Sequence, residues 1–277
     1  MVLYIIGLGM GTEDDITLRG LNAVKSCTRV YLEAYTSILC VGKEKLEALY
    51  GKEVTLASRE MVESESDTIL DGAKEGNVAM LVVGDPVCAT THTDMMIRAR
   101  ELDIPVEVIH NASVMGAAGS CGLHLYNFGA TVSIPYFTEG WRPYSFWEKT
   151  AYNRKGGMHT LALLDIKTKE PDFEALAKGK KVYLPPRFMS VNVALEQMLE
   201  AAESKGEEEG NYSKDTMCVG MARLGQKDQC IKVGSIEELL KEDFGEPLHC
   251  LVICADDVHE LELEAMKHYI VAGSRYA

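Results

Sequence analysis

Three glycines and three acidic residues lie together near the start of the chain. Residues 2–6 are apolar and typical of a strand, and Gly7, Gly9 and Gly11 follow them. Glycines in such a turn allow the backbone to approach a bound ligand closely. The pattern therefore indicates a ligand-binding loop between a strand and a helix, unless the glycines only form a tight turn and the acids only cap the helix.

The acidic residues limit which ligand this loop can bind. In a dinucleotide-binding motif the third glycine would fall at Thr12, and Glu33, at the end of the next predicted strand, would bind a ribose. A pyrophosphate needs the positive N-terminal end of a helix, but Glu13, Asp14 and Asp15 occupy that end. The order favours a ligand without phosphate or one with a positive charge.

Two further turns follow predicted strands in the same way. In "LVVGDPVCATTHTD", Pro86 restricts Asp85 to an extended conformation at a strand end, where its carboxylate can accept hydrogen bonds from an amine or a hydroxyl. In "HNASVMGAAG", Ser113 and Val114 begin a run of small residues. Alternatively, Asp85 only caps a helix, and the small residues after Ser113 only allow close helix packing.

Strand-like and helix-like runs alternate on both sides of these turns. The expected strands include residues 2–7, 29–33, 79–85, 106–110, 159–167, 216–225 and 249–255. The expected helices include residues 17–26, 43–50, 67–75, 93–101, 191–204 and 236–242. This alternation predicts an α/β protein, which we divide into two α/β domains joined near residues 110–115.

Composition excludes several classes of protein. The net charge of −14 over 277 residues disfavours binding to nucleic acid or anionic lipid. The eight cysteines form no CxxC motif, which argues against a zinc site and for free thiols in a reducing compartment. No apolar run reaches the roughly 18 residues of a membrane span, and the first strand leaves no room for a signal peptide. We therefore expect a cytoplasmic protein without a metal.

A family resemblance emerges from several segments taken in order. "LYIIGLGMG", "TSIL", "VVGDPVCATTH", "IHNASVMGAAG", "LLDIK", "PPRFMSVN" and "GEPLH" resemble the diphthine synthases of the tetrapyrrole methylase superfamily. The resemblance runs from Met1 to about His259, and it is the joint order of these segments, not any single motif, that makes it specific.

The resemblance implies a fold and an activity. The fold would be two α/β domains with mostly parallel or mixed sheets, residues 1–112 and 113–277, as in class III methyltransferases, with S-adenosyl-L-methionine in the cleft between them. The enzyme would be a homodimer that methylates the amino group of the 3-amino-3-carboxypropyl-histidine of elongation factor 2. The segment "EALAKGKKVYLPPRFMSVN" resembles the eukaryotic type, which also methylates the carboxylate to give diphthine methyl ester.

The same resemblance implies the cofactor-binding residues. They are residues at matching motif positions, partly through their backbone groups: Met10, Asp85, Cys88, Ser113, Val114, Leu164, Leu224 and His249. Met10 and Cys88 depart from the residues usual in the family. No catalytic side chain is predicted, because direct methyl transfer from a sulfonium needs no covalent intermediate. His249 could instead be a core histidine, since it precedes an apolar strand.

Three other functions remain as alternatives. A methylase of a corrin or siroheme precursor would share the fold, but its carboxylate-rich substrate would favour a basic cleft. A nicotinamide-dependent oxidoreductase would use Gly7, Gly9 and Glu33. A non-catalytic module could keep the fold and bind the cofactor without turnover. The aromatic residues Tyr136, Phe137, Trp141 and Trp147 either line the acceptor entrance or pack in a core or dimer interface.

Overall fold

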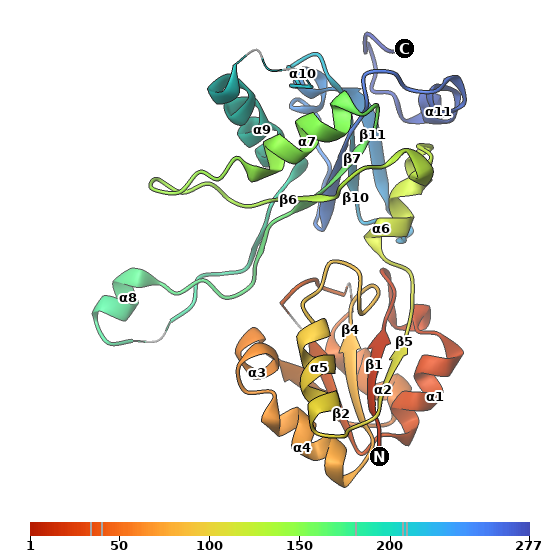
Figure 1. Ribbon diagram of the computed structural model, residues 1–277, viewed down its shortest axis with the longest axis vertical. Coiled ribbons are helices and arrows are strands. Elements are labelled where there is room, and N and C mark those ends of the chain that lie inside the picture. Colours follow the sequence, from red (N-terminus) through yellow and green to blue (C-terminus); the bar gives the residue numbers. More distant parts are fainter. Residues whose placement is uncertain (34, 40, 181, 207, 209) are drawn as a thin grey trace. The chain divides into compact units, whose positions relative to one another are not determined.

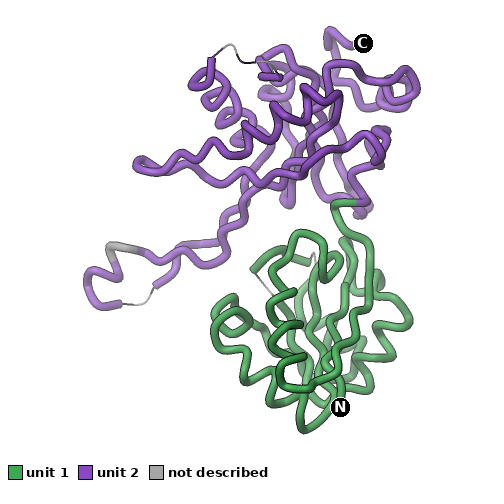
Figure 2. Tube along the Cα trace, in the orientation of Figure 1, with its two compact units in different colours: residues 1–115 green, residues 116–277 purple. Residues whose placement is uncertain are grey.

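The chain folds into two compact units. The computed structural model describes residues 1–277 except residues 34, 40, 181, 207 and 209. Unit 1 comprises Met1–Met115 and unit 2 comprises Gly116–Ala277 (Figure 2). Residues 113–115, which the sequence placed in the second domain, thus belong to unit 1 by their contacts.

Unit 1 is built on a parallel five-stranded sheet. Its strand order is β3-β2-β4-β1-β5, and every pairing is parallel. The strands are β1 (Leu3–Gly7), β2 (Arg29–Glu33), β3 (Thr55–Ala57), β4 (Val78–Val82) and β5 (Val106–Ile109). All five residues of β4 are buried, as expected for a parallel strand covered on both faces.

Helices cover both faces of this sheet (Figure 1). They are α1 (Leu18–Ser26), α2 (Lys43–Tyr50), α3 (Arg59–Glu63), α4 (Asp67–Glu75) and α5 (Thr93–Glu101), with the 3-10 turn η1 (Glu13–Asp15). Leu3 and Ile5 pack with residues of α3, α4 and α5, whereas Ile6 packs with residues of α1 and α2. Alternate residues of β1 therefore face opposite helical layers.

Unit 2 has a mixed sheet. The strand order is β11-β10-β12-β7-β6, in which only the β6–β7 pair is parallel. The strands are β6 (Val132–Ile134), β7 (Thr160–Leu164), β10 (Met217–Ala222), β11 (Cys230–Ser235) and β12 (His249–Ile253). The predicted fold class, two α/β domains with parallel and mixed sheets, is confirmed.

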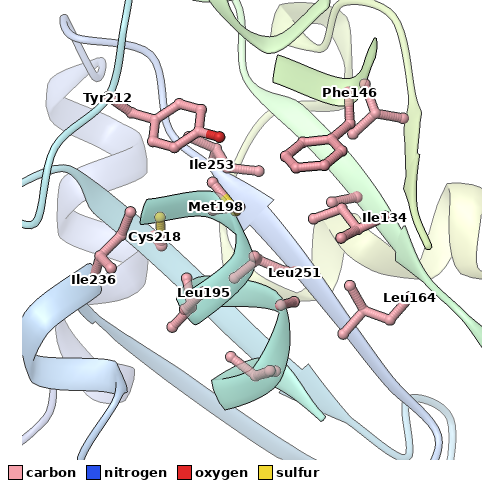
Figure 3. Close-up of a cluster of buried hydrophobic side chains, with 14 of the residues drawn as sticks. Ile134, Phe146, Leu164, Leu195, Met198, Tyr212, Cys218, Ile236, Leu251 and Ile253 are labelled. Carbon is pink, nitrogen blue, oxygen red and sulfur yellow. The ribbon is translucent and has the colours of Figure 1, made fainter. Parts of the chain in front are cut away.

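The core of unit 2 lies between this sheet and two helices. The helical elements of unit 2, with α6 at the boundary of the units, are α6 (Val114–Ala117), η2 (Ala118–Cys121), η3 (Leu125–Asn127), α7 (Ser145–Lys155), α8 (Phe173–Ala177), α9 (Val191–Lys205), α10 (Ile236–Leu239), α11 (Glu260–Met266) and η4 (Lys267–Tyr269). Leu195 and Met198 of α9 point toward Leu251 and Ile253 of β12, with Phe146 of α7 beside them (Figure 3). This core fixes the sheet whose edge bears the predicted residues of unit 2.

A two-stranded arm, residues 166–188, extends from the sheet of unit 2 (Figure 1). At its base, β8 (Ile166–Lys167) pairs antiparallel with β9 (Arg187–Phe188). Farther out, an isolated bridge joins Pro171 and Tyr183, and α8 lies near the tip. Within the described part of the chain, no helix is long and apolar enough to cross a membrane.

Candidate functional site

Three turns of unit 1 meet at the carboxyl edge of its parallel sheet. The turns after β1 and β4 are joined by an isolated bridge in which Gly9 and Gly84 exchange two backbone hydrogen bonds, with N···O distances of 3.2 and 2.7 Å. Gly9 and Gly84 have φ values of +78° and +80°, which favour glycine. The two predicted loops are thus hydrogen-bonded to each other at the edge where open α/β sheets bind ligands.

Asn111, two residues after the end of β5, connects the third turn to the first through hydrogen bonds. Its Nδ2 donates to Gly7 O at 3.0 Å and to Asp15 O at 2.9 Å. A Cβ atom on Gly7 would lie 2.6 Å from Gly84 O, so only glycine fits where these turns cross. Sequence reasoning missed Asn111; the signal was its position immediately after a strand, beside the noted Ser113.

Asp85 is the buried acid at the centre of this edge. Its side chain is only 6% exposed. Oδ1 accepts from Val87 N at 3.0 Å, while Oδ2 accepts from Asn111 N at 3.0 Å and lies 2.9 Å from His110 Nδ1. Burial raises the pKa of Asp85, but these hydrogen bonds outweigh it and hold the pKa below its ordinary value. Asp85 is therefore ionised and shapes two of the turns.

The acidic residues after the glycines are part of the loop itself. Asp15 Oδ2 accepts the Gly11 N–H at 2.7 Å, and the Thr12 hydroxyl accepts from Asp14 N at 3.4 Å. A carboxylate thus already holds an amide that a phosphate would need. The loop favours a ligand that has no phosphate, as the sequence predicts.

The carboxylate of Glu33 also accepts hydrogen bonds from residues of unit 1. Its side chain is fully buried, and its carboxylate accepts from Tyr35 N at 2.8 Å and from the Thr36 hydroxyl at 2.5 Å. Burial raises the pKa of Glu33, yet the hydrogen bonds it accepts lower it overall. Glu33 orders the turn after β2, and its side chain is not exposed to an external ribose.

The remaining predicted residues of unit 1 lie on the same turns. Met10 is half-buried on the glycine loop, and Cys88 is half-buried with its N–H donating to Asp85 O at 3.3 Å. A Cβ atom on Gly84 would lie 3.8 Å from Ser113 Cβ, which places Ser113 beside the second turn. Val114 begins α6 and is half-buried. The structure brings the five predicted residues of unit 1 to one edge.

The predicted residues of unit 2 also share one sheet edge. Leu164 ends β7, Leu224 follows β10, and His249 begins β12. In the register, His249 pairs with Ala222 while the next residue, Cys250, pairs with Leu163. Because β12 runs opposite to β7 and β10, its start lies beside their ends.

Both ring nitrogens of His249 form hydrogen bonds with groups of unit 2. Its Nδ1 accepts from Val191 N at 3.3 Å, and its Nε2 lies 3.1 Å from both Gly245 O and Glu246 O. The ring is therefore neutral, with the proton on Nε2, and it caps the N-terminus of α9. Burial is the main reason why the pKa of His249 is lowered. The side chain is half-buried and forms its hydrogen bonds within unit 2.

The aromatic residues divide between core and surface. Trp147 is buried and donates its Nε1–H to Asn211 Oδ1 at 2.7 Å. Tyr136 and Phe137 pack against the same core, whereas Trp141 is 54% exposed. Trp147 therefore packs in the core. Of the four aromatic residues, Trp141 is the one whose side chain is exposed to an incoming substrate.

Comparison with known proteins identifies the family. The family model of the tetrapyrrole (corrin/porphyrin) methylases matches residues 2–240. The chain belongs to this family. It is 57% identical to a diphthine methyl ester synthase of Schizosaccharomyces pombe over 98% of this chain and 95% of that one.

Further relatives agree over nearly the full length. The human diphthine methyl ester synthase is 52% identical over 98% of this chain and 95% of its own. The crystal structure of a diphthine synthase superposes with a TM-score of 0.83 at 31% identity, covering 98% of this chain and 96% of that one. The predicted family and the predicted class of enzyme, a methyltransferase, are confirmed.

Proposed function

We propose that this methyltransferase uses S-adenosyl-L-methionine to methylate a 3-amino-3-carboxypropyl-histidine on elongation factor 2, giving diphthine methyl ester. The observation that carries the proposal is the similarity, over nearly the whole chain, to diphthine methyl ester synthases of a yeast and of human. It favours this function over that of a methylase of corrin or siroheme precursors, and the chain's charge of −14 favours it further.

The edge of unit 1 fits such a cofactor. S-adenosyl-L-methionine is a sulfonium cation without phosphate, so the ionised Asp85 and the acids after the glycines do not repel it. The Gly11 N–H, which a dinucleotide would need, is held by Asp15. Met10, Asp85, Cys88, Ser113 and Val114 would hold the cofactor from unit 1, largely through backbone groups.

The other residues that we propose for cofactor binding lie at one edge of the unit 2 sheet. Leu164 ends β7, Leu224 follows β10 and His249 begins β12, so the three residues share one edge of the sheet. The His249 ring is occupied by Val191, Gly245 and Glu246. We therefore assign its cofactor contact to the backbone, and the ring to positioning the start of β12.

The chemistry then requires positioning more than acid–base groups. When bound, the cofactor supplies a methyl group that is already activated for in-line displacement. The protein must hold the acceptor nitrogen in line at about 3 Å and keep it neutral, a task for rigid backbone turns. The carboxylate of the acceptor needs no base, because its ionised form is the nucleophile. We accordingly assign no catalytic side chain and no metal.

The proposal includes the setting of the reaction. The protein substrate would be elongation factor 2, and the enzyme would act as a homodimer in the cytoplasm without nucleic acid or membrane. The seven described cysteines are unpaired, which supports a reducing compartment.

A transfer assay tests this function. Elongation factor 2 carrying the unmethylated intermediate is incubated with the enzyme and S-adenosyl-L-methionine labelled in its methyl group. We expect label in the elongation factor and none in a uroporphyrinogen-type acceptor offered in parallel. Tight binding of S-adenosylhomocysteine with no label in either acceptor would favour the non-catalytic module, and label only in the tetrapyrrole would favour the alternative enzyme.

A further inference from the structure

Methylation of nitrogen requires a proton transfer that is separate from the transfer of the methyl group. An amine is protonated at neutral pH, and a proton must leave it before its lone pair can attack. Histidine is the side chain most often used as a general base at this pH. The methyl transfer step needs no catalytic side chain, but the step before it needs a base with a free lone pair near the bound cofactor.

His110 lies at the edge of unit 1 that we propose for the cofactor. It directly follows β5, which ends at Ile109, at the carboxyl edge of the parallel sheet. The strand β5 pairs with β1, and the turn after β1 bears Met10. The side chain of His110 is 68% exposed. His110 is thus accessible to an acceptor and shares its turn with Ser113 and Val114.

The partner of His110 fixes which ring nitrogen carries the proton. Nδ1 of His110 lies 2.9 Å from Oδ2 of Asp85. Asp85 is buried and ionised, so its carboxylate can only accept and Nδ1 must donate. The proton of the neutral ring is therefore on Nδ1, and Nε2 has a lone pair. Nε2 forms no hydrogen bond with any residue that the structure describes.

The carboxylate of Asp85 is itself held in place from both sides. Oδ1 accepts from Val87 N and Oδ2 accepts from Asn111 N, both at 3.0 Å. A carboxylate fixed beside an imidazole orients the ring and stabilises the imidazolium that forms when the ring takes up a proton. The pair therefore has the arrangement of a histidine base with its orienting aspartate.

We propose that Nε2 of His110 removes the proton of the acceptor ammonium before each methyl transfer to nitrogen, with Asp85 as its positioning residue. The N–H bond of the ammonium breaks and an Nε2–H bond forms. The freed lone pair then forms the new bond to the methyl carbon as the C–S bond breaks, and S-adenosylhomocysteine leaves. The exposed imidazolium returns its proton to water. The inference rests on the proposed function and adds a base to it.

The two acceptor groups of the substrate allow a test of this role. The acceptor carboxylate is ionised and needs no base, whereas the amine does. The variant His110→Asn keeps a donor for Asp85, because its amide nitrogen takes the place of Nδ1, but it cannot take up a proton. On elongation factor 2 with the unmethylated intermediate, we expect the rate of alkali-stable labelling to fall at least about tenfold.

The ester step serves as the internal control. Mild alkali converts the wild-type product into elongation factor 2 with a trimethylated amine and a free carboxylate. On this acceptor, His110→Asn should transfer the ester methyl group within about twofold of the wild-type rate. Its affinity for S-adenosylhomocysteine, measured by calorimetry, should be unchanged. The matched variant His268→Asn, at an exposed histidine of η4, should alter neither rate.

Nuclear magnetic resonance tests the tautomer without any methyl transfer. In the cofactor-free protein with isotope-labelled histidine, the signals that disappear in His110→Asn should show the proton on Nδ1 at a pH of about 8. A proton on Nε2 would overturn the inference whatever the activity. Equal rates of alkali-stable labelling in variant and wild type, or equal losses in nitrogen and ester transfer, would also overturn it. A wild type that labels neither group would refute the proposed function, and the inference with it.

Discussion

Asp85 links the turn after β4 to the turn after β5 through one carboxylate, so its removal should disturb the carboxyl edge of unit 1. Val87 N, Asn111 N and His110 would each lose their acceptor in an Asp85→Ala variant. We expect the affinity for S-adenosylhomocysteine to fall at least about tenfold, since buried donors left unpaired cost about 1–3 kcal/mol each. Isothermal titration calorimetry measures the change.

A matched aspartate separates this effect from a general loss of charge. Asp71 is exposed on α4 and pairs with Lys74 at 2.9 Å. Asp71→Ala should leave the cofactor affinity within about twofold, because exposed ion pairs contribute little. Equal affinities of the Asp85→Ala variant and the wild type would remove Asp85 from the site.

Because the imidazole of His249 has a lowered pKa, we predict that the stability of the protein depends on pH. This pKa is lowered mainly because the ring is buried, and the charge of Arg223 lowers it further, so the folded protein disfavours the proton. The stabilisation is therefore complete above the unfolded pKa of about 6.5 and is lost as the pH falls through the folded value.

The variant His249→Asn tests that sign. The asparagine oxygen can still accept from Val191 N, but the side chain no longer titrates. Between pH values of about 7.5 and 5.5, the wild-type Tm should fall by a few degrees more than the Tm of the variant. Equal shifts, measured by calorimetry or circular dichroism, would show that protonation of His249 does not couple to folding.

Single residues also show what the sequence could and could not predict about the site. The glycines, Asp85 and Ser113 were visible because each lies in a turn after a predicted strand and belongs to a segment that resembles the family. Asn111 was not, since its role depends on contacts with Gly7 and Asp15, about a hundred residues earlier in the chain. The capping role of the His249 ring was equally hidden, because Val191 is brought to it only by the packing of α9.

Among the elements, the turn after β1 depends on glycine at position 7. A Cβ atom there would meet Gly84 O at 2.6 Å and Asn111 Cβ at 2.8 Å, and the first of these is a backbone atom that cannot rotate away. We expect Gly7→Ala to destabilise the protein by about 1–3 kcal/mol and to weaken cofactor binding. Urea unfolding and calorimetry give the two quantities. Gly140→Ala is the control, because nothing lies within 4 Å of its added Cβ.

The helix α10 fixes the C-terminal segment through Glu238. Its carboxylate accepts from Ser235 N at 2.7 Å, the Ser274 hydroxyl at 2.8 Å and Arg275 N at 3.0 Å. Burial raises its pKa, but these hydrogen bonds outweigh that effect and lower the pKa to about 2. The stabilisation from Glu238 is thus present above the usual glutamate pKa of about 4.3 and is lost as the pH falls toward that lowered value.

The Glu238→Gln variant should release this segment. Its amide nitrogen cannot accept, so the hydrogen bonds to residues 274 and 275 cannot all be kept. Hydrogen exchange in residues 270–277 should become faster, while Glu196→Gln, at an exposed position of α9, should leave exchange unchanged. Unchanged exchange in the Glu238→Gln variant would contradict the tethering role.

Element prediction succeeded where the hydrophobic pattern was local. The expected helix at residues 191–204 corresponds to α9, and the expected strand at 249–255 corresponds to β12. The helix α7 was missed because it buries Thr150, Asn153 and Arg154 along with apolar residues, which obscures the helical period. The strand β11 was missed because its antiparallel pairing with β10 is a tertiary property.

At the scale of the whole molecule, the sequence predicted two α/β units, and the structure contains a parallel sheet in one and a mixed sheet in the other. Each unit presents its predicted residues at one sheet edge. The predicted sheets were mostly parallel or mixed, but the sequence did not show which strands of the second sheet are antiparallel, since strand direction depends on connections such as the β10–β11 turn and not on the apolar runs themselves.

The central claim is that these edges serve methyl transfer to a modified histidine of elongation factor 2. The most direct measurement is the mass of the modified elongation-factor peptide after reaction with S-adenosyl-L-methionine, before and after mild alkaline treatment. We predict four added methyl groups, of which alkali removes one, because three are on nitrogen and one is an ester. A peptide whose mass is unchanged by the enzyme, although the enzyme binds the cofactor, would contradict the account.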